Sequence, residues 1–176
     1  FFCCNVCNMI TALYRRNIKP GTEYNDLIPD SVCHSTFRGD GDTYHSMDLI
    51  QEFIEDYSYQ VSKLAPQLKA KTVEKTVTNI YNFLYNHIQY KADGAAQEIR
   101  SPQCTWHSRS RGADCKSFSV FAGALCKELG IPFSIRKIQQ PGDSDGNFSH
   151  VYIIVHQKNK PHLVIDANKH ENNESF

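Results

Sequence analysis

The chain has 176 residues, of which 40% are hydrophobic and 22% charged, as is ordinary for a single globular domain. Its 19 basic and 19 acidic residues balance, so the overall charge gives no reason to expect nucleic acid or a membrane surface as a partner. No apolar stretch approaches the roughly 20 residues that a membrane-spanning helix needs. The composition therefore favours neither a nucleic-acid-binding protein nor a membrane protein.

The cysteine count and the N-terminus bear on the compartment. The chain has seven cysteines, an odd number that would leave one thiol over in a complete disulfide framework. The first ten residues, FFCCNVCNMI, are apolar but lack the basic leader and the small-residue cleavage site of a signal peptide. We therefore expect free thiols in an intracellular, reducing compartment such as the cytoplasm.

Helical patterns come first along the chain. Residues 8–16 predict a short helix, and residues 18–48, rich in Gly, Pro, Asp, Ser and Thr, predict loops and turns. Apolar residues at helical spacing predict two amphipathic helices. The first covers residues 49–64 and is expected to end at Pro66, and the second covers residues 73–88.

A third predicted helix begins at a cysteine. Apolar residues fall on one face from Cys115 onward, Asp114 is a suitable N-cap, and Gly130 supplies the C-terminal stop. A helix N-terminus has unpaired N–H groups and a partial positive charge, which together lower the pKa of a thiol. The same N–H groups can stabilise an oxyanion. The position of Cys115 is therefore suited to a nucleophile.

After this helix, the spacing of apolar residues changes from the helical period to the alternation that is typical of strands. Residues 133–138, 150–155 and 162–167 predict three strands, the last two joined by a hairpin turn. Helices followed by antiparallel strands indicate an α+β domain, with the nucleophile helix packed on an antiparallel sheet.

The expected organisation has three parts. Residues 1–70 are an N-terminal extension of helix and loop that could act as a lid or a docking segment. Residues 71–168 form the catalytic core, and residues 169–176 form a polar tail. The sequence predicts no particular oligomeric state.

The hairpin offers a base for the thiol. With its turn centred on Lys158, His150 would lie directly opposite Asp166, and directly opposite residues point to the same face of a sheet. Val151 and Ile153 would then point to the other, apolar face. A register slip of one residue would separate the histidine from the aspartate. The pattern thus predicts a Cys–His–Asp arrangement.

These residues resemble a known family. Gly112 to Cys115 at a helix start, then ALCKELGIPFSIRKI, HVYIIV and LVIDAN, are similar to the transglutaminase-like superfamily over about residues 80–168. The resemblance implies a papain-like fold, with Cys115 as nucleophile, His150 as general base and acid, and Asp166 as the orienting carboxylate. It implies acyl transfer on amide bonds of peptides or proteins, as a protease, an amidase or a transglutaminase, without cofactor or metal.

Finer features of the resemblance concern origin and details of the site. The stretch from Glu98 to Ser119 looks like phage or prophage members, some of which would be virion-associated. Many relatives have an acidic residue after the cysteine, where this chain has Lys116, which would help to hold a thiolate.

The side chain that completes the oxyanion hole is not fixed by the pattern. Gln103 and Trp106 are equal candidates, since an amide and an indole both offer N–H donors, and both could instead be pocket walls. Gln97 is a third option.

Two other functions compete with catalysis. Cys4 and Cys7, spaced as C-x2-C, could bind structural zinc together with Cys33 and His34. Alternatively, the chain could be an inactive member of the same fold that serves as a structural or binding protein, including a virion protein.

Overall fold

A computed structural model describes residues 16–30, 32–39, 42–94, 96–140, 148–169 and 172. The elements in chain order are the 3-10 helix η1 (Thr22–Leu27), α2 (Thr43–Tyr57), the 3-10 helix η2 (Ser58–Val61), α3 (Ala65–Leu68), α4 (Val73–His87), α5 (Pro102–His107), α6 (Cys115–Glu128), β1 (Phe133–Ile138), β2 (His150–Val155) and β3 (Leu163–Ile165).

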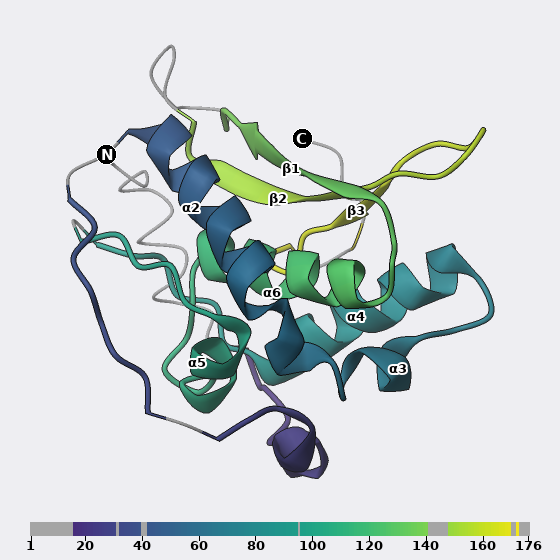
Figure 1. Ribbon diagram of the computed structural model, residues 1–176, viewed down its shortest axis with the longest axis horizontal. Helices are drawn as coiled ribbons and strands as arrows, with labels where there is room; N and C mark the ends of the chain where they lie inside the picture. The colour runs from purple at the N-terminus through teal and green to yellow at the C-terminus, as the bar shows by residue number, and fades with distance from the viewer. Residues whose placement is uncertain are drawn as a thin grey trace.

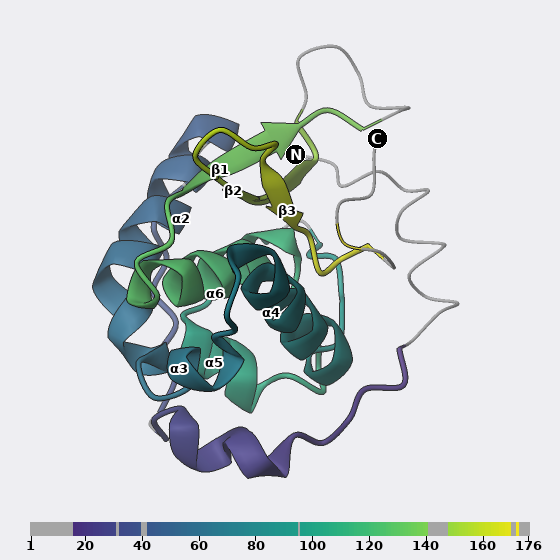
Figure 2. The same ribbon diagram turned by 90° about the vertical axis from the view of Figure 1, so that its right-hand side faces the viewer.

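Helix α6 lies at the centre of the molecule. The antiparallel sheet, in the order β1-β2-β3, covers one side of it, and α2, α4, α5 and η2 also pack against it (Figures 1 and 2). Helices before a small antiparallel sheet confirm the predicted α+β class.

Two apolar clusters hold these elements together. In the larger one, Leu84 of α4, Phe121 of α6 and Ile153 of β2 are fully buried. The smaller one joins Ile54 of α2 to Cys115 at the start of α6. The nucleophile candidate is therefore anchored by packing between α2 and α6.

Two of the helices predicted from residue 49 onward are confirmed, whereas the first differs at both ends and gives way to η2 after Tyr57. Helices η1 and α5 were not predicted. Helices α4 and α6 have the predicted extents within a residue or two. The first predicted helix instead starts earlier, at Thr43, because the Asp42 side chain caps it by accepting a hydrogen bond from the His45 N–H at 2.9 Å. Pro66 does not end this helix but lies in the first turn of α3, where a missing N–H costs no hydrogen bond.

Strands β1 and β2 have the predicted bounds, whereas β3 is shorter than the predicted residues 162–167 and pairs in a different register. The β2–β3 register pairs Ile153 with Ile165 and Val155 with Leu163, so the turn is centred on residue 159 rather than on Lys158. Asn159 adopts a left-handed conformation with φ of 57°, which asparagine tolerates in tight turns. The predicted register is wrong by two residues, but an even shift keeps every side chain on its predicted face.

The segment before residue 70 contributes to the same core as the rest of the chain. Ile28, Ile54 and Val61 are all buried. The predicted helix at residues 8–16 lies outside the described residues apart from Arg16, and residues 169 and 172 are the only described part of the predicted tail.

The prediction of free thiols is wrong for two cysteines. Cys33 and Cys104, 71 residues apart in sequence, form a disulfide. Cys115 and Cys126 are buried and form no disulfide with any described residue. The other three cysteines lie outside the described residues.

Candidate active site

Asp114 fixes the start of α6. Its Oδ1 accepts hydrogen bonds from the backbone N–H groups of Lys116, at 3.1 Å, and Ser117, at 3.3 Å. This is the N-cap that the sequence predicts, and it sets the first helical residue at Cys115. The Cys115 side chain consequently lies at the positive end of α6, where only 5% of the residue is exposed.

The turn before Cys115 is pinned to the segment that follows α4. The Ala113 carbonyl accepts a hydrogen bond from the Lys91 N–H at 2.9 Å, and the Ala113 N–H donates one to the Gln89 carbonyl at 3.0 Å. Gly112 has φ of 98°, in the region that glycine favours.

We expect Gly112→Ala to destabilise the protein by about 1–3 kcal/mol, because the new Cβ combines backbone strain with overpacking. That Cβ would lie 2.7 Å from the Lys91 Cβ and 3.2 Å from the Gln89 carbonyl oxygen. Urea unfolding measures the change. Gly130→Ala is the matched control, because Gly130 also has positive φ but a methyl group there would meet no other atom within 4 Å. An equal loss in both variants would contradict the role of the clash.

His150 and Asp166 form a buried pair on the hairpin. His150 Nε2 lies 2.7 Å from Asp166 Oδ2. The other carboxylate oxygen accepts the Asn168 N–H at 3.3 Å. The two residues are diagonal rather than directly opposite neighbours, since β3 ends at Ile165 and the register differs from the prediction. Their contact survives because both side chains still point to the same face.

One cleft brings the candidates together. Cys115, Gln103 and His150 line a cleft of about 1440 Å³ that lies between α2, α5, the start of α6 and the start of β2. Asp166 lies behind His150, outside the lining of this cleft. A cysteine, a histidine and a glutamine thus line one cleft.

Trp106 is a core residue, and this position argues against its predicted role as an oxyanion donor. Its side chain is fully buried, stacks on Phe83 and does not line the cleft. Its indole N–H donates to Asn25 Oδ1 at 3.1 Å, which satisfies the only donor of the ring. The sequence could not separate the two candidates, because both lie on the short helix α5 and point in different directions.

Gln97 and Gln103 both line the cleft. The side-chain amide of Gln97 donates a hydrogen bond to the Gly94 carbonyl at 2.8 Å and accepts one from Lys116 Nζ at 2.8 Å. Gln103 is buried in the first turn of α5, with its backbone N–H donating to Gln60 Oε1 at 3.0 Å. Gln103 lines the same cleft as Cys115 and is kept as the candidate donor.

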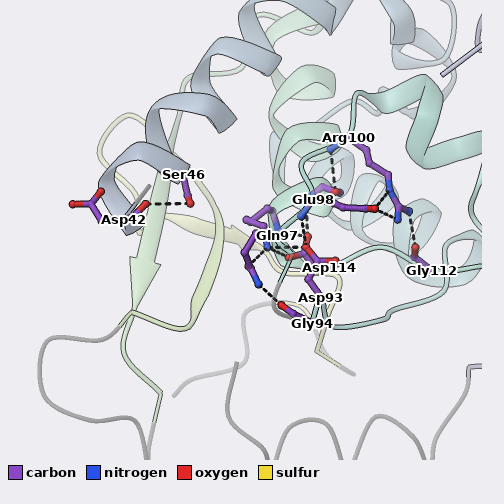
Figure 3. Close-up of polar contacts among 11 residues, drawn as sticks. Asp42, Ser46, Asp93, Gly94, Gln97, Glu98, Arg100, Gly112 and Asp114 are labelled. Atoms are coloured by element: carbon purple, nitrogen blue, oxygen red, sulfur yellow. Dashed lines mark hydrogen bonds and ion pairs between the residues drawn. The ribbon is translucent and has the colours of Figure 1, made fainter. Parts of the chain in front are cut away.

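A charged network surrounds the start of α6. The buried Lys116 Nζ forms ion pairs with Asp114 Oδ2 and with Asp93 Oδ2, the latter at 3.1 Å. Figure 3 shows Asp93, Gln97 and Asp114 close together, with Arg100 reaching towards Gly112. The two carboxylates offset the charge that Lys116 was expected to offer to a thiolate. Asp93 was missed at the sequence level, because nothing in the loop sequence KADG points to a distant lysine.

The zinc alternative loses one of its proposed ligands. Cys33 is bonded to Cys104, and Cys4 and Cys7 lie outside the described residues. Within the described ranges, no group of three or more His, Cys, Asp or Glu side chains is placed to hold a metal ion. Cys126 is also unsuited to chemistry, because burial raises the pKa of its thiol to about 12.

Comparison with known families identifies the fold. The family model of the transglutaminase-like superfamily matches residues 62–159, which is more than half of the chain. The chain belongs to the transglutaminase-like superfamily. The match includes Cys115 and His150 and stops before Asp166. No curated protein and no solved structure matches the chain significantly. Transglutaminase-like proteins are generally enzymes. No helix of the described part is long and apolar enough to cross a membrane.

Proposed function

We propose that this transglutaminase-like chain is a cysteine-dependent acyl-transfer enzyme that acts on amide bonds of peptides or proteins. The observation that carries the proposal is the buried His150–Asp166 pair, at 2.7 Å, beside the same cleft that Cys115 lines at the N-terminus of α6. In this proposal Cys115 is the nucleophile, His150 the general base and acid, and Asp166 the residue that orients the imidazole.

The contact between His150 and Asp166 gives the two ring nitrogens of His150 different roles in this proposal. Nε2 is engaged with Asp166, so Nδ1 is the nitrogen that would exchange a proton with the thiol. The helix N-terminus favours the thiolate form of Cys115. The helical N–H groups, together with the Gln103 amide, would hold the oxyanion.

The reaction proceeds in two balanced halves. The Cys115 thiolate attacks the amide carbonyl carbon, and the resulting tetrahedral oxyanion collapses with cleavage of the C–N bond. Protonated His150 gives its proton to the leaving amine, which leaves a thioester on Cys115. His150 then takes a proton from water or from a second amine as that molecule attacks the thioester and frees the thiol.

The acyl acceptor decides the kind of enzyme. Water as acceptor makes the chain a peptidase or an amidase, whereas a primary amine makes it a transglutaminase. The triad serves both reactions, so the acceptor is determined by what else binds in the cleft.

The disulfide bears on the compartment. The reducing cytoplasm expected from the N-terminal sequence is a poor match for the Cys33–Cys104 disulfide, because cytosolic reductants keep thiols reduced. We therefore propose an oxidising compartment for the form with this bond. A phage origin and a virion location remain predictions that rest on the stretch from Glu98 to Ser119 alone.

Alkylation by iodoacetamide against pH tests the proposal. We expect Cys115 to be modified faster than any other thiol at pH well below the ordinary cysteine pKa of about 8.5, with the site located by peptide mass. Amide substrates, offered with and without a fluorescent primary amine, then separate hydrolysis from transfer. If Cys115 instead reacts only as the ordinary thiol does, the chain is better explained as an inactive structural or binding member of the superfamily.

A further inference from the structure

An extended segment forms one wall of the cleft. Residues 32–39, here called the strap, lie between η1 and α2 in the chain and contain no helix or strand. Every residue of the strap is exposed, including Val32 at 76% and Phe37 at 83%. All of them nevertheless line the cleft. Figure 1 shows the backbone of the strap at the outer edge of the molecule. The strap is thus a thin outer wall with little packing of its own.

Few contacts hold the strap in place. The disulfide joins Cys33 to Cys104 on α5, next to the candidate oxyanion residue Gln103. At the other end, Arg38 Nη2 lies 2.9 Å from Glu52 Oε1, with both side chains largely exposed. An exposed ion pair contributes little stability, so the disulfide is the main anchor. Cys33 is itself exposed, which leaves the bond open to reductants.

The strap and the nucleophile share one cavity. Cys115 is only 5% exposed and lines the same cleft as the strap. A substrate must therefore reach the thiol through a cleft of which the strap forms one wall. The disulfide links this wall covalently to α5. We expect a cleft walled in this way to admit a flexible polypeptide segment more readily than the surface of a folded protein.

We propose that the Cys33–Cys104 disulfide is a clasp that determines the class of substrate that reaches Cys115. With the bond intact, the cleft admits extended, flexible peptide segments. A dithiol reductant breaks the S–S bond and supplies two electrons and two protons, leaving two cysteine thiols and the oxidised reductant. The strap is then held only by exposed contacts and moves aside, so that loops of folded proteins are admitted. The substrate part of this proposal rests on the proposed function, whereas access to the thiol does not.

Access is measured with two thiol reagents of different size. We compare the rates at which iodoacetamide and a maleimide attached to a small folded protein modify Cys115, with the modified residue located by peptide mass. In the Cys33→Ser/Cys104→Ser variant, we expect the ratio of large-reagent to small-reagent rate to rise about tenfold or more over that of the oxidised wild type. Reduction of the wild type by a dithiol should raise the ratio in the same direction.

Two controls keep the outcome clear. Cys126 is fully buried, so its modification reports unfolding rather than opening of the strap. Glu52→Gln removes only the exposed ion pair of the strap and should leave the ratio within about twofold of wild type. An unchanged ratio in the double variant, with Cys126 still protected, overturns the clasp. If the ratio rises but no amide substrate is turned over, the clasp stands and the proposed function fails.

Discussion

The His150→Ala variant is expected to lower turnover of an amide substrate by about 10²- to 10⁴-fold, the range for loss of a positioned general acid–base. Without the imidazole, the thiol loses its base and the leaving amine loses its proton donor. The loss should appear in kcat, because the side chain acts on the reacting atoms. Iodoacetamide modification of Cys115 should slow at pH 6–7 for the same reason, since the partner that favours the thiolate is gone.

The matched control lies at the other end of the same strand. His156 follows β2 and bonds to Ser134 Oγ at 3.0 Å and to His162 at 3.3 Å, away from the cleft. His156→Ala should therefore leave turnover unchanged. Asp166→Asn tests the third member, because an amide is isosteric but uncharged and stabilises the imidazolium less. Wild-type turnover in His150→Ala would remove the triad from the mechanism.

The Lys116→Met variant is expected to lose about 3–5 kcal/mol of stability, the cost of breaking a buried ion pair by removing one partner. Asp114 and Asp93 would then keep their charges with no cation between them. The pKa of the Cys115 thiol should rise, because an uncompensated carboxylate at Asp114 disfavours a neighbouring thiolate. Alkylation of Cys115 would accordingly shift to higher pH.

Urea unfolding and the alkylation profile check both effects. Lys127 is the matched control, because it lies on the same helix but pairs with Glu55 at the surface. Lys127→Met should cost no more than about 1 kcal/mol. Adding Asp93→Asn to Lys116→Met removes one of the two stranded charges and should recover part of the loss. Equal stability of the two lysine variants would show that the buried network around Lys116 contributes no more to stability than the surface pair of Lys127.

The sequence alone was sufficient where the determinants are local. Helical periodicity, the Asp114 cap and the glycine at residue 130 are all adjacent to the helix they shape, so α6 and its cysteine could be placed correctly. The face of each hairpin side chain follows from strict alternation, so the His150–Asp166 contact was predicted although the register was not.

Tertiary structure decided whatever depends on partners distant in the sequence. The pairing of Cys33 with Cys104 across 71 residues has no local signature, and an odd number of cysteines pointed away from it. Trp106 and Gln103 look alike as donors in the sequence, but packing against Phe83 turns the tryptophan into the core and leaves the glutamine at the cleft. Lys116 finds Asp93 only because the loop after α4 folds back onto α6. Local propensity fixes where an element begins and which face is apolar, whereas contacts between elements depend on how the chain closes on itself.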